Sequence, residues 1–232
     1  MNIKYSYYSS LGNRQNNEDA SVVVKTANGL LAVVADGLGG MAYGEFASRK
    51  AIETLADDLC HLKVSAESLE AAISHANTAI CDGHELYPDS RTTIAAVWIS
   101  EEEAIAMHVG DTRIYHFRGD KIMYQSMDHT VAQLAVRAGD ISLEEIRSYD
   151  RRNVLIRALG SDTPPKITKN KLDLQAGDHV LICSDGFWEA IWEKEMISEM
   201  VGADTAEEWL SIMRKHVEPK ADDNNTAIAI SI

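Results

Sequence analysis

Aspartates stand at the ends of apolar runs throughout this sequence, and this pattern limits the folds open to the chain. Three apolar runs lead directly into Asp36, Asp111 and Asp185, two of which are followed by glycine. The run at residues 30–35 is continuously apolar, which is typical of a strand buried on both faces. The fold must therefore bury several strands completely while bringing their polar ends to a surface.

Two further aspartates stand just before strand-like runs, Asp19 near the start of the chain and Asp223 near its end. If the five strand ends converge, carboxylates share one pocket, and their mutual repulsion raises their pKa values or requires a counter-charge. Hard divalent cations such as Mg²⁺ or Mn²⁺ supply that charge, because they prefer carboxylate, carbonyl and water oxygens. The alternative is that each Asp-Gly pair is only a turn signal, and the pattern alone leaves this open.

Strand-like and helical runs are grouped along the chain. A regular alternation would predict a doubly wound parallel sheet, so the grouping argues against that fold. We expect strands at residues 3–8, 21–25, 30–35, 92–99, 104–109, 114–117, 172–174, 179–183 and 226–232. We expect helices at residues 45–62 and 65–81, two short ones within 128–149 that break at 139–140, and others at 187–201 and 205–216. Strands that cluster apart from helices predict two packed sheets with helices outside them.

The charge balance excludes some partners. The 232 residues carry 22 basic and 36 acidic side chains, a net charge of −14, which repels phosphate backbones and anionic lipids. We therefore expect no nucleic acid and no membrane as partners. The three cysteines lack a CxxC pair, no N-terminal signal is visible, and no apolar stretch approaches the ~20 residues of a membrane helix. These features predict a soluble, cytoplasmic protein with reduced thiols, and we expect a monomer.

Eight short strings, in one order along the chain, resemble the metal-dependent protein phosphatases, the protein phosphatase 2C family. They are GNRQNNEDA at 12–20, VADGLGG at 34–40, RTT at 91–93, HVGDTRIY at 108–115, DHT at 128–130, RNVLIRALG at 152–160, CSDG at 183–186 and DDNNT at 222–226. Each string alone is a weak signal. Eight in family order at sensible spacings are specific, and they cover nearly the whole chain. The bacterial branch that consists of a minimal catalytic domain is the nearest resemblance.

The resemblance implies an α+β fold. It is a four-layer α-β-β-α sandwich, in which two packed, mostly antiparallel sheets are flanked by helix pairs. One catalytic domain would span residues 1–232, with a flap insertion at approximately 128–165. This agrees with the two packed sheets expected from the order of the elements.

The resemblance also implies a set of metal ligands: Asp19, Asp36, Gly37, Asp111, Asp185 and Asp223. Asp36 would bridge two Mn²⁺ or Mg²⁺ ions and the Gly37 carbonyl would bind one of them. Asp185 and Asp223 would complete the first metal site, with Asp19 close by as a direct or water-mediated ligand. Asp111 would join Asp185 around a third, weaker site.

The implied activity is a serine/threonine phosphoprotein phosphatase, in which a metal-bridging water attacks phosphorus and Asp36 and Arg14 are catalytic. Two metals can lower the pKa of a shared water and orient it for in-line attack. Arg14 has a planar fork of donors that suits bidentate contact with phosphate. By family resemblance, the substrates would be phosphorylated proteins and the enzyme would oppose a cytoplasmic Ser/Thr kinase.

One departure from the family pattern concerns the mechanism. Many bacterial members have a histidine, a proposed general acid, where this chain has Met41, and methionine cannot donate a proton. A second interpretation is therefore a weakly active or non-catalytic module that binds phosphoproteins. A third is a metal-dependent hydrolase of small phosphoesters, because a fold does not fix a substrate. Retention of all the metal-site aspartates favours the enzyme.

The flap region is rich in arginine although the chain as a whole is acidic. It contains Arg137, Arg147, Arg151, Arg152 and Arg157. One hypothesis is that some of these residues steer a phosphorylated protein towards the metals, and the other is that they only solvate the flap. We expect His108 and His129 to be structural, because the predicted site is made of oxygen ligands.

Overall fold

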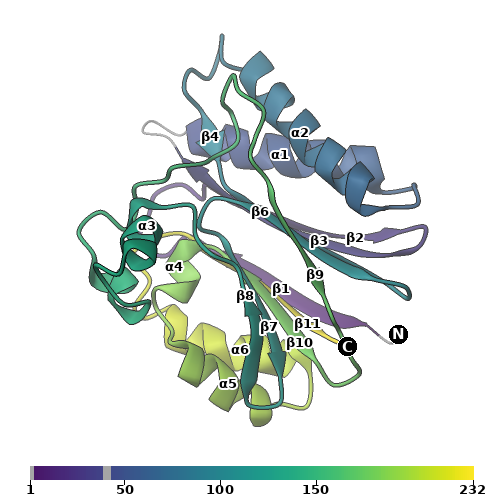
Figure 1. Ribbon diagram of the computed structural model, residues 1–232, viewed down its shortest axis with the longest axis vertical. Coiled ribbons are helices and arrows are strands. Elements are labelled where there is room, and N and C mark those ends of the chain that lie inside the picture. Colours follow the sequence, from purple (N-terminus) through teal and green to yellow (C-terminus); the bar gives the residue numbers. More distant parts are fainter. Residues whose placement is uncertain (1–2, 39–42) are drawn as a thin grey trace.

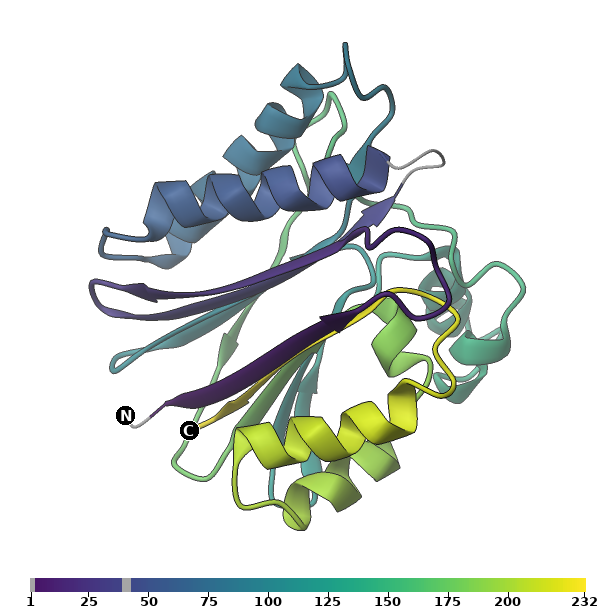
Figure 2. The same cartoon turned by 180° about the vertical axis from the view of Figure 1, so that it is seen from behind.

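The computed structural model describes residues 3–38 and 43–232. Two antiparallel β-sheets face each other, and helices cover the outer face of each sheet (Figures 1 and 2). This is the four-layer α-β-β-α arrangement, so the predicted fold class is confirmed. No helix in the described ranges is long and apolar enough to cross a membrane.

The first sheet has six strands in the order β2-β3-β5-β6-β9, with β4 paired to β3 beside β5. Its strands are β2 (Asp19–Thr26), β3 (Gly29–Leu38), β4 (Arg91–Thr92), β5 (Ile94–Ser100), β6 (Ala104–Val109) and β9 (Thr168–Leu172). Helices α1 (Tyr43–Leu59) and α2 (Ala66–Asp82) pack on its outer face. Strand β5 is buried along its whole length because both faces of the sheet are covered, which explains its uninterrupted apolar sequence.

The second sheet has five strands in the order β1-β11-β10-β7-β8. They are β1 (Lys4–Ser10), β7 (Arg113–Arg118), β8 (Lys121–Gln125), β10 (His179–Cys183) and β11 (Asn225–Ser231). Its outer face is covered by α5 (Glu193–Val201) and α6 (Ala206–Val217), while the one-turn helix α4 (Asp185–Trp188) follows β10 directly. Buried aromatic side chains such as Trp209 fill the space between these helices and the sheet.

Alternation of side chains along each strand assigns residues to the two sides of its sheet. On β11, Ile228 and Ile230 belong to the core between the sheets, whereas Ala227 and Ala229 belong to the core under the helices. This period of two follows from the pleat of a strand, which points successive side chains to opposite faces. The layer between the sheets is therefore mainly aliphatic and packs the two sheets against each other.

The flap lies between β8 and β9 and contains α3 (Val131–Ala138) and the 3₁₀ helix η1 (Glu144–Ser148). Thr130 caps the start of α3 by accepting a bond from the Gln133 N–H, and Gly139 ends it at φ 80°. A residue with positive φ stops a helix, and glycine adopts this conformation without strain. The predicted pair of short helices broken at residues 139–140 is confirmed.

Three details of the predicted elements are wrong. The strand expected at 172–174 is β9, which ends at Leu172. Its residues Lys169, Asn170 and Lys171 are polar and gave no strand signal, because an edge strand does not need alternating apolar side chains. Strand β8 is also an edge strand and was not expected. The single helix expected at 187–201 is divided into α4 and α5. The Trp192 N–H donates to the Glu195 side chain and so caps the N-terminus of α5.

Candidate active site

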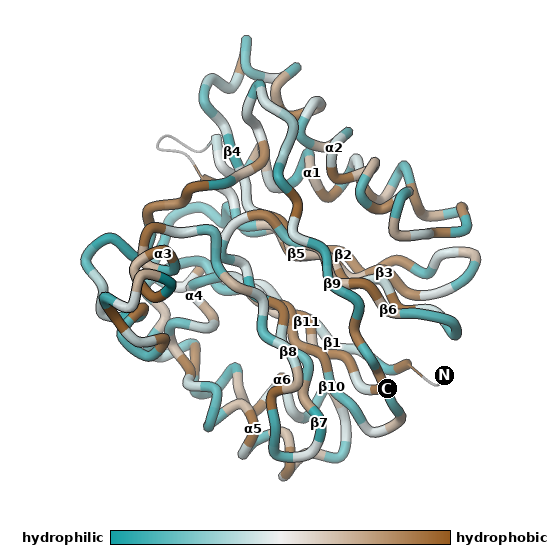
Figure 3. Tube along the Cα trace, in the orientation of Figure 1, coloured by the Kyte–Doolittle hydropathy of each residue, from teal (hydrophilic) through white to brown (hydrophobic). Residues whose placement is uncertain are grey.

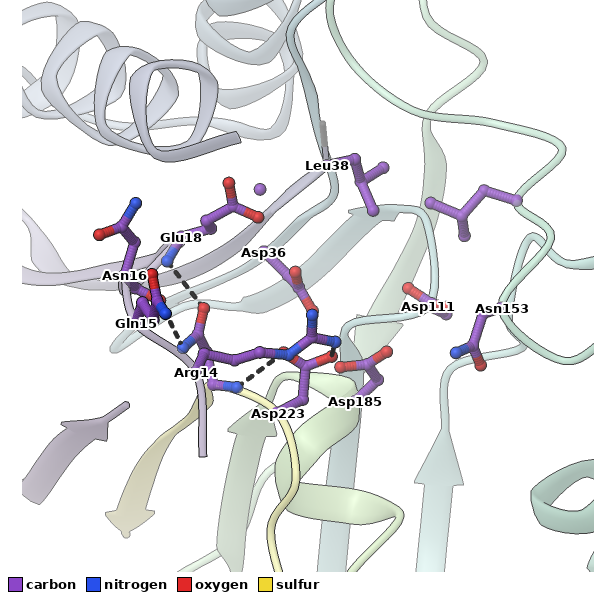
Figure 4. Close-up of a pocket in the computed structure, with 13 residues that line it drawn as sticks. Arg14, Gln15, Asn16, Glu18, Asp36, Leu38, Asp111, Asn153, Asp185 and Asp223 are labelled. Atoms are coloured by element: carbon purple, nitrogen blue, oxygen red, sulfur yellow. Dashed lines mark hydrogen bonds and ion pairs between the residues drawn. The ribbon is translucent and has the colours of Figure 1, made fainter. Parts of the chain in front are cut away.

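Carboxylates from both sheets converge at one end of the sandwich (Figure 4). Asp36 lies on β3, Asp111 follows β6, Asp185 begins α4 and Asp223 precedes β11. With Arg14 they line an open cavity of about 450 Å³. The structure thus brings together side chains that are up to 209 positions apart in the sequence.

Asp19 joins the two sheets behind this cavity. It pairs with Asp36 in the register of β2 and β3, and its side chain is buried. The Ser184 hydroxyl, at the end of β10 in the other sheet, donates a bond of 2.8 Å to Asp19 Oδ2. The cavity therefore lies where the two sheets meet. Asp19 lies behind the residues that line it and is not itself part of the lining.

Gly37 also lines the cavity, and its lack of a side chain has a reason in the packing. A Cβ at Gly37 would lie 2.2 Å from the carbonyl oxygen of Gly44 in α1, which is far inside van der Waals contact. The Gly37 N–H donates to the Glu18 carbonyl at 3.1 Å. Two glycines therefore let α1 begin directly against the end of β3, at the edge of the site.

Two threonines hold the backbone of Asp36. Its N–H donates to Thr93 Oγ1 at 3.0 Å, while its carbonyl accepts from the Thr93 N–H and from Thr92 Oγ1. The indole N–H of Trp188 donates to the Asp111 carbonyl at 3.0 Å. These positioning residues stand in or beside the matched strings, but the sequence pattern gave them no role because their partners are distant along the chain.

The buried carboxylates carry strongly perturbed proton affinities. Burial raises the pKa of Asp36 and of Asp111 well above the ordinary range, and the neighbouring carboxylates raise both further. Burial raises the pKa of Asp19 to about 7 and that of Asp185 to about 6 for the same reasons. Carboxylates in this cluster raise one another's pKa, and such clusters are typical of functional sites.

Arg14 contacts this cluster at the mouth of the cavity. Its Nη2 lies 2.7 Å from Asp223 Oδ2, and its side chain is 58% exposed at the mouth of the cavity. The hydrogen bond to Asp223 raises the pKa of Arg14 above its ordinary value. Asn224 holds the loop that contains Arg14. Its side chain accepts a hydrogen bond from the Glu18 N–H and donates to the carbonyls of Leu11 and Asn16. Asn224 lies in a matched string, but sequence reasoning assigned it no role.

The donor set of the cavity fits a hard divalent cation. The groups that line it are carboxylates, carbonyls and amides, with no thiolate or imidazole among them. Within residues 3–38 and 43–232, no group of three or more acidic, cysteine or histidine side chains is arranged so that it could hold a metal ion by itself. The arrangement is an open carboxylate pocket, which suits ions that keep several water ligands, as Mg²⁺ does.

Comparison with known proteins decides the family. The profile of the protein phosphatase 2C family matches residues 8–222 of this chain. The chain belongs to the protein phosphatase 2C family. The predicted resemblance is thereby confirmed. Mycobacterium tuberculosis PstP, a serine/threonine protein phosphatase, is 31% identical over 226 residues, which are 94% of this chain and 43% of PstP. The chain thus spans less than half the length of this relative.

Solved structures of protein phosphatase 2C relatives agree in fold. A Streptococcus agalactiae serine/threonine phosphatase superposes with a TM-score of 0.91 over 99% of both chains at 24% identity. The catalytic domain of PstP in complex with two manganese ions superposes with a TM-score of 0.82 over 99% of this chain and 97% of that domain, at 29% identity. The whole protein phosphatase 2C fold is therefore present.

The flap of this protein phosphatase 2C chain uses several of its arginines internally. Arg147 donates to the Trp188 carbonyl at 2.9 Å and pairs with Glu193, and Arg152 pairs with Glu189. Arg157 donates to the Lys166 carbonyl. Such bonds stabilise the flap, so the steering hypothesis is left mainly with Arg137 and Arg151, which are exposed.

Two motif histidines and Met41 complete the sequence-derived candidates. The rings of His108 and His129 stack at 4.6 Å, and neither ring lines the cavity. His108 Nε2 contacts the Met127 carbonyl at 2.9 Å, while His129 Nδ1 accepts from the Gly110 N–H at 3.1 Å. Met41 lies outside the described residues.

Proposed function

We propose that the chain is a metal-dependent serine/threonine phosphoprotein phosphatase that hydrolyses phosphomonoesters. The observation that carries this proposal is the uncompensated carboxylate cluster, which lies open to solvent with one exposed arginine at its mouth. The names of the relatives support it, since PstP is a serine/threonine protein phosphatase. Hydrolysis consumes one water, breaks the P–O bond to the substrate oxygen and releases phosphate and an alcohol.

In this proposal Asp36, Asp185 and Asp223, with the Gly37 carbonyl and Asp19 behind them, hold two Mn²⁺ or Mg²⁺ ions. When bound, the ions would lower the pKa of a shared water and orient it for attack on phosphorus. Asp111 and Asp185 would hold a third, weaker ion. The PstP complex with two manganese ions supports the count and favours Mn²⁺.

Arg14 binds the phosphoryl group in this proposal. Its guanidinium is charged, exposed and anchored by Asp223 at the mouth of the cavity, so its free donors can contact two phosphoryl oxygens. Thr92, Thr93 and Trp188 keep the backbones of Asp36 and Asp111 fixed while the substrate enters. We further propose that the protein acts as a cytoplasmic monomer and opposes a Ser/Thr kinase.

The test is phosphate release from a phosphothreonine peptide with Mn²⁺ and with EDTA. We expect release by the wild type in Mn²⁺ only. Asp36→Asn removes a carboxylate that would contact both ions. We expect its activity to fall by more than about 100-fold, because changing a residue that only orients a metal ligand already costs up to about 100-fold. Asp173→Asn is the matched control because that side chain is 89% exposed and lies away from the cavity.

The alternatives give different outcomes in the same assay. Manganese binding without phosphate release by the wild type would contradict the enzyme and favour the phosphoprotein-binding module, with Met41→His as the next variant. Faster release from small phosphometabolites than from the peptide would favour the third interpretation.

A further inference from the structure

His129 lies at the base of the flap, on the segment that joins β8 to α3. It belongs to a matched string, but the proposed function gives it no role. Its ring does not line the cavity, yet it contacts Gly110, and the next residue along the chain is Asp111. Asp111 is one of the carboxylates that line the cavity (Figure 4). His129 is therefore one residue removed from a candidate metal ligand.

Both backbone groups of Gly110 are bonded to His129. The Gly110 N–H donates to His129 Nδ1 at 3.1 Å, and the Gly110 carbonyl accepts from the His129 N–H at 2.9 Å. One residue of the flap thus fixes the two peptide groups on either side of the Gly110 Cα. The second of these groups is the planar peptide bond to Asp111, so its orientation decides where the Asp111 side chain begins.

The conformation of Gly110 makes it dependent on such contacts. Its φ is 106°, which glycine adopts freely and other residues rarely adopt. A Cβ at this position would also lie 2.6 Å from the side chain of Thr93, so a residue with less backbone freedom does not fit. Because glycine has so much freedom, groups outside it must hold it in one conformation.

The hydrogen bonds of His129 define its tautomer. Nδ1 accepts from the Gly110 N–H, so the proton of the neutral ring is on Nε2, which donates to Thr168 Oγ1 of β9 at 2.9 Å. The Arg157 guanidinium lies 3.2 Å from the same Nε2 and opposes a positive charge on the ring. Burial lowers the pKa of His129 to about 3, so Nδ1 remains an acceptor at neutral pH.

The surroundings of His129 make its hydrogen bond to Gly110 costly to lose. The residue is 5% exposed, and its ring stacks on that of His108. Its carbonyl accepts from the Ile156 N–H at 2.8 Å, and Figure 3 shows a mostly apolar stretch there, between α3 and β4. A buried N–H without an acceptor costs about 1–3 kcal/mol, so removal of Nδ1 favours reorientation of the Gly110 peptide group.

The other end of the Asp111 backbone is held separately. The indole N–H of Trp188, in α4, donates to the Asp111 carbonyl at 3.0 Å. The peptide group before Gly110 is held by the His129 ring, and the carbonyl after it by the His129 backbone. Of these two residues that hold the Gly110–Asp111 segment, only His129 belongs to the flap.

We propose that His129 is a positioning residue, which holds Asp111 through Gly110 in the place that the weakest-bound Mn²⁺ ion requires. This inference rests on the proposed function, in which Asp111 and Asp185 hold a third ion. It concerns that ion alone, because the backbone of Asp36 is held by Thr93 instead. Residues that orient a metal ligand contribute about 10- to 100-fold in metal affinity.

Two substitutions separate positioning from packing. Asparagine places its side-chain oxygen near the position of Nδ1 and can accept from Gly110, whereas glutamine places its amide near the position of Nε2, beside Thr168. His129→Asn and His129→Gln both remove the imidazole that stacks on His108. A merely structural role therefore predicts the same loss for both variants, and a positioning role predicts a loss for glutamine only.

The measurement is Mn²⁺ binding, so that it does not depend on turnover. Calorimetric titration of the metal-free protein with Mn²⁺ gives the Kd of each binding step, and Asp111→Asn identifies the step that depends on Asp111. We expect His129→Gln to raise the Kd of that step about tenfold, and His129→Asn to raise it less than about threefold. Neither variant should change the tighter steps by more than about twofold.

A histidine away from the cavity provides the matched control. His84 follows α2, and its Nε2 contacts the Ser90 carbonyl at 3.0 Å. His84→Gln makes the same chemical change as His129→Gln, but we expect it to leave every Mn²⁺ binding step unchanged. Thermal unfolding of each variant shows whether the fold is kept.

The outcomes separate this inference from the proposed function. Three results would each overturn it, whatever the phosphate assay gives: an unchanged Kd in His129→Gln, equal losses in both His129 variants, or a wild type without a step that depends on Asp111. Absence of phosphate release by the wild type, with the difference between asparagine and glutamine intact, would instead overturn the proposed catalysis and leave the positioning role standing.

Discussion

The carboxylate cavity and the ion-pair network beneath the flap both bury charge, but only the network balances it. In the network, Arg113 is 2% exposed and donates to both oxygens of Asp128 at 2.9 and 2.7 Å. It also contacts the Tyr115 hydroxyl and lies 3.4 Å from the ring centre of Trp188. Every charge there has an opposite partner within the chain.

The cavity has no such internal balance. Asp36, Asp111 and Asp185 lie close to other carboxylates, and Arg14, which lines the same cavity, is exposed. A buried charge is costly to leave once its opposite partner is removed, whereas a buried carboxyl without a partner takes up a proton or binds a cation. The difference between these two regions distinguishes a structural cluster from a functional one.

A second balanced cluster lies at the other end of the molecule. Asp178 accepts from Arg118 through both oxygens, and it accepts from the Gln175 N–H and contacts His116 Nε2. Its side chain is buried, yet these donors outweigh the burial and hold the pKa of Asp178 at about 2. Burial raises the pKa of Asp36, Asp111 and Asp185, so the pKa of the same residue type shifts in opposite directions in the two clusters.

The largest expected effect is on the balanced network. Asp128→Ala leaves the Arg113 guanidinium buried without a counter-charge, and we expect the free energy of unfolding to fall by about 3–5 kcal/mol in a denaturant titration. The double variant Arg113→Met with Asp128→Leu removes both charges and should recover most of that loss. A loss below about 1 kcal/mol for Asp128→Ala would contradict the assignment of this cluster as structural.

The next effect is the pH dependence of the second balanced cluster. A carboxyl with a folded-state pKa of about 2, against 3.8 ordinarily, stabilises the fold above pH 4 and loses this contribution as the pH falls towards 2. The wild type should exceed Asp178→Asn by about 2 kcal/mol at pH 6 and by about half of that at pH 3. A difference that does not change between these pH values would show that the ion pair is not the source of the stability.

The smallest effect has the opposite sign. Asp36→Asn removes one uncompensated charge from the cavity, so in EDTA we expect the variant to be more stable than the wild type by about 1 kcal/mol. For a chain of this size that raises the melting temperature by about 2–4 °C. Asp128→Asn, the matched change in the balanced network, should lower it. A fall for both variants would remove the distinction between the two regions.

Local sequence patterns predicted the elements and the carboxylates, since a buried strand that ends in aspartate is visible within ten residues. Strand β6 was placed at its observed bounds for this reason. Edge strands β8 and β9 were missed or displaced, because one exposed face and one open edge remove the apolar pattern. The partners of Arg113, Asp178 and Asn224 could not be predicted, since each bond joins residues that only the completed fold brings together.

The position of the cavity over the seam between the sheets also sets when it can exist. Asp19 and Asp36 are synthesised near the beginning of the chain, whereas Asp185 and Asp223 follow about 150 to 200 residues later. Pairing of β11 with β1 and β10 joins the two ends of this long loop, and such distant closures are slow steps in folding. A partly translated chain therefore lacks Asp185 and Asp223, and the complete carboxylate cavity forms only after the last strand has paired.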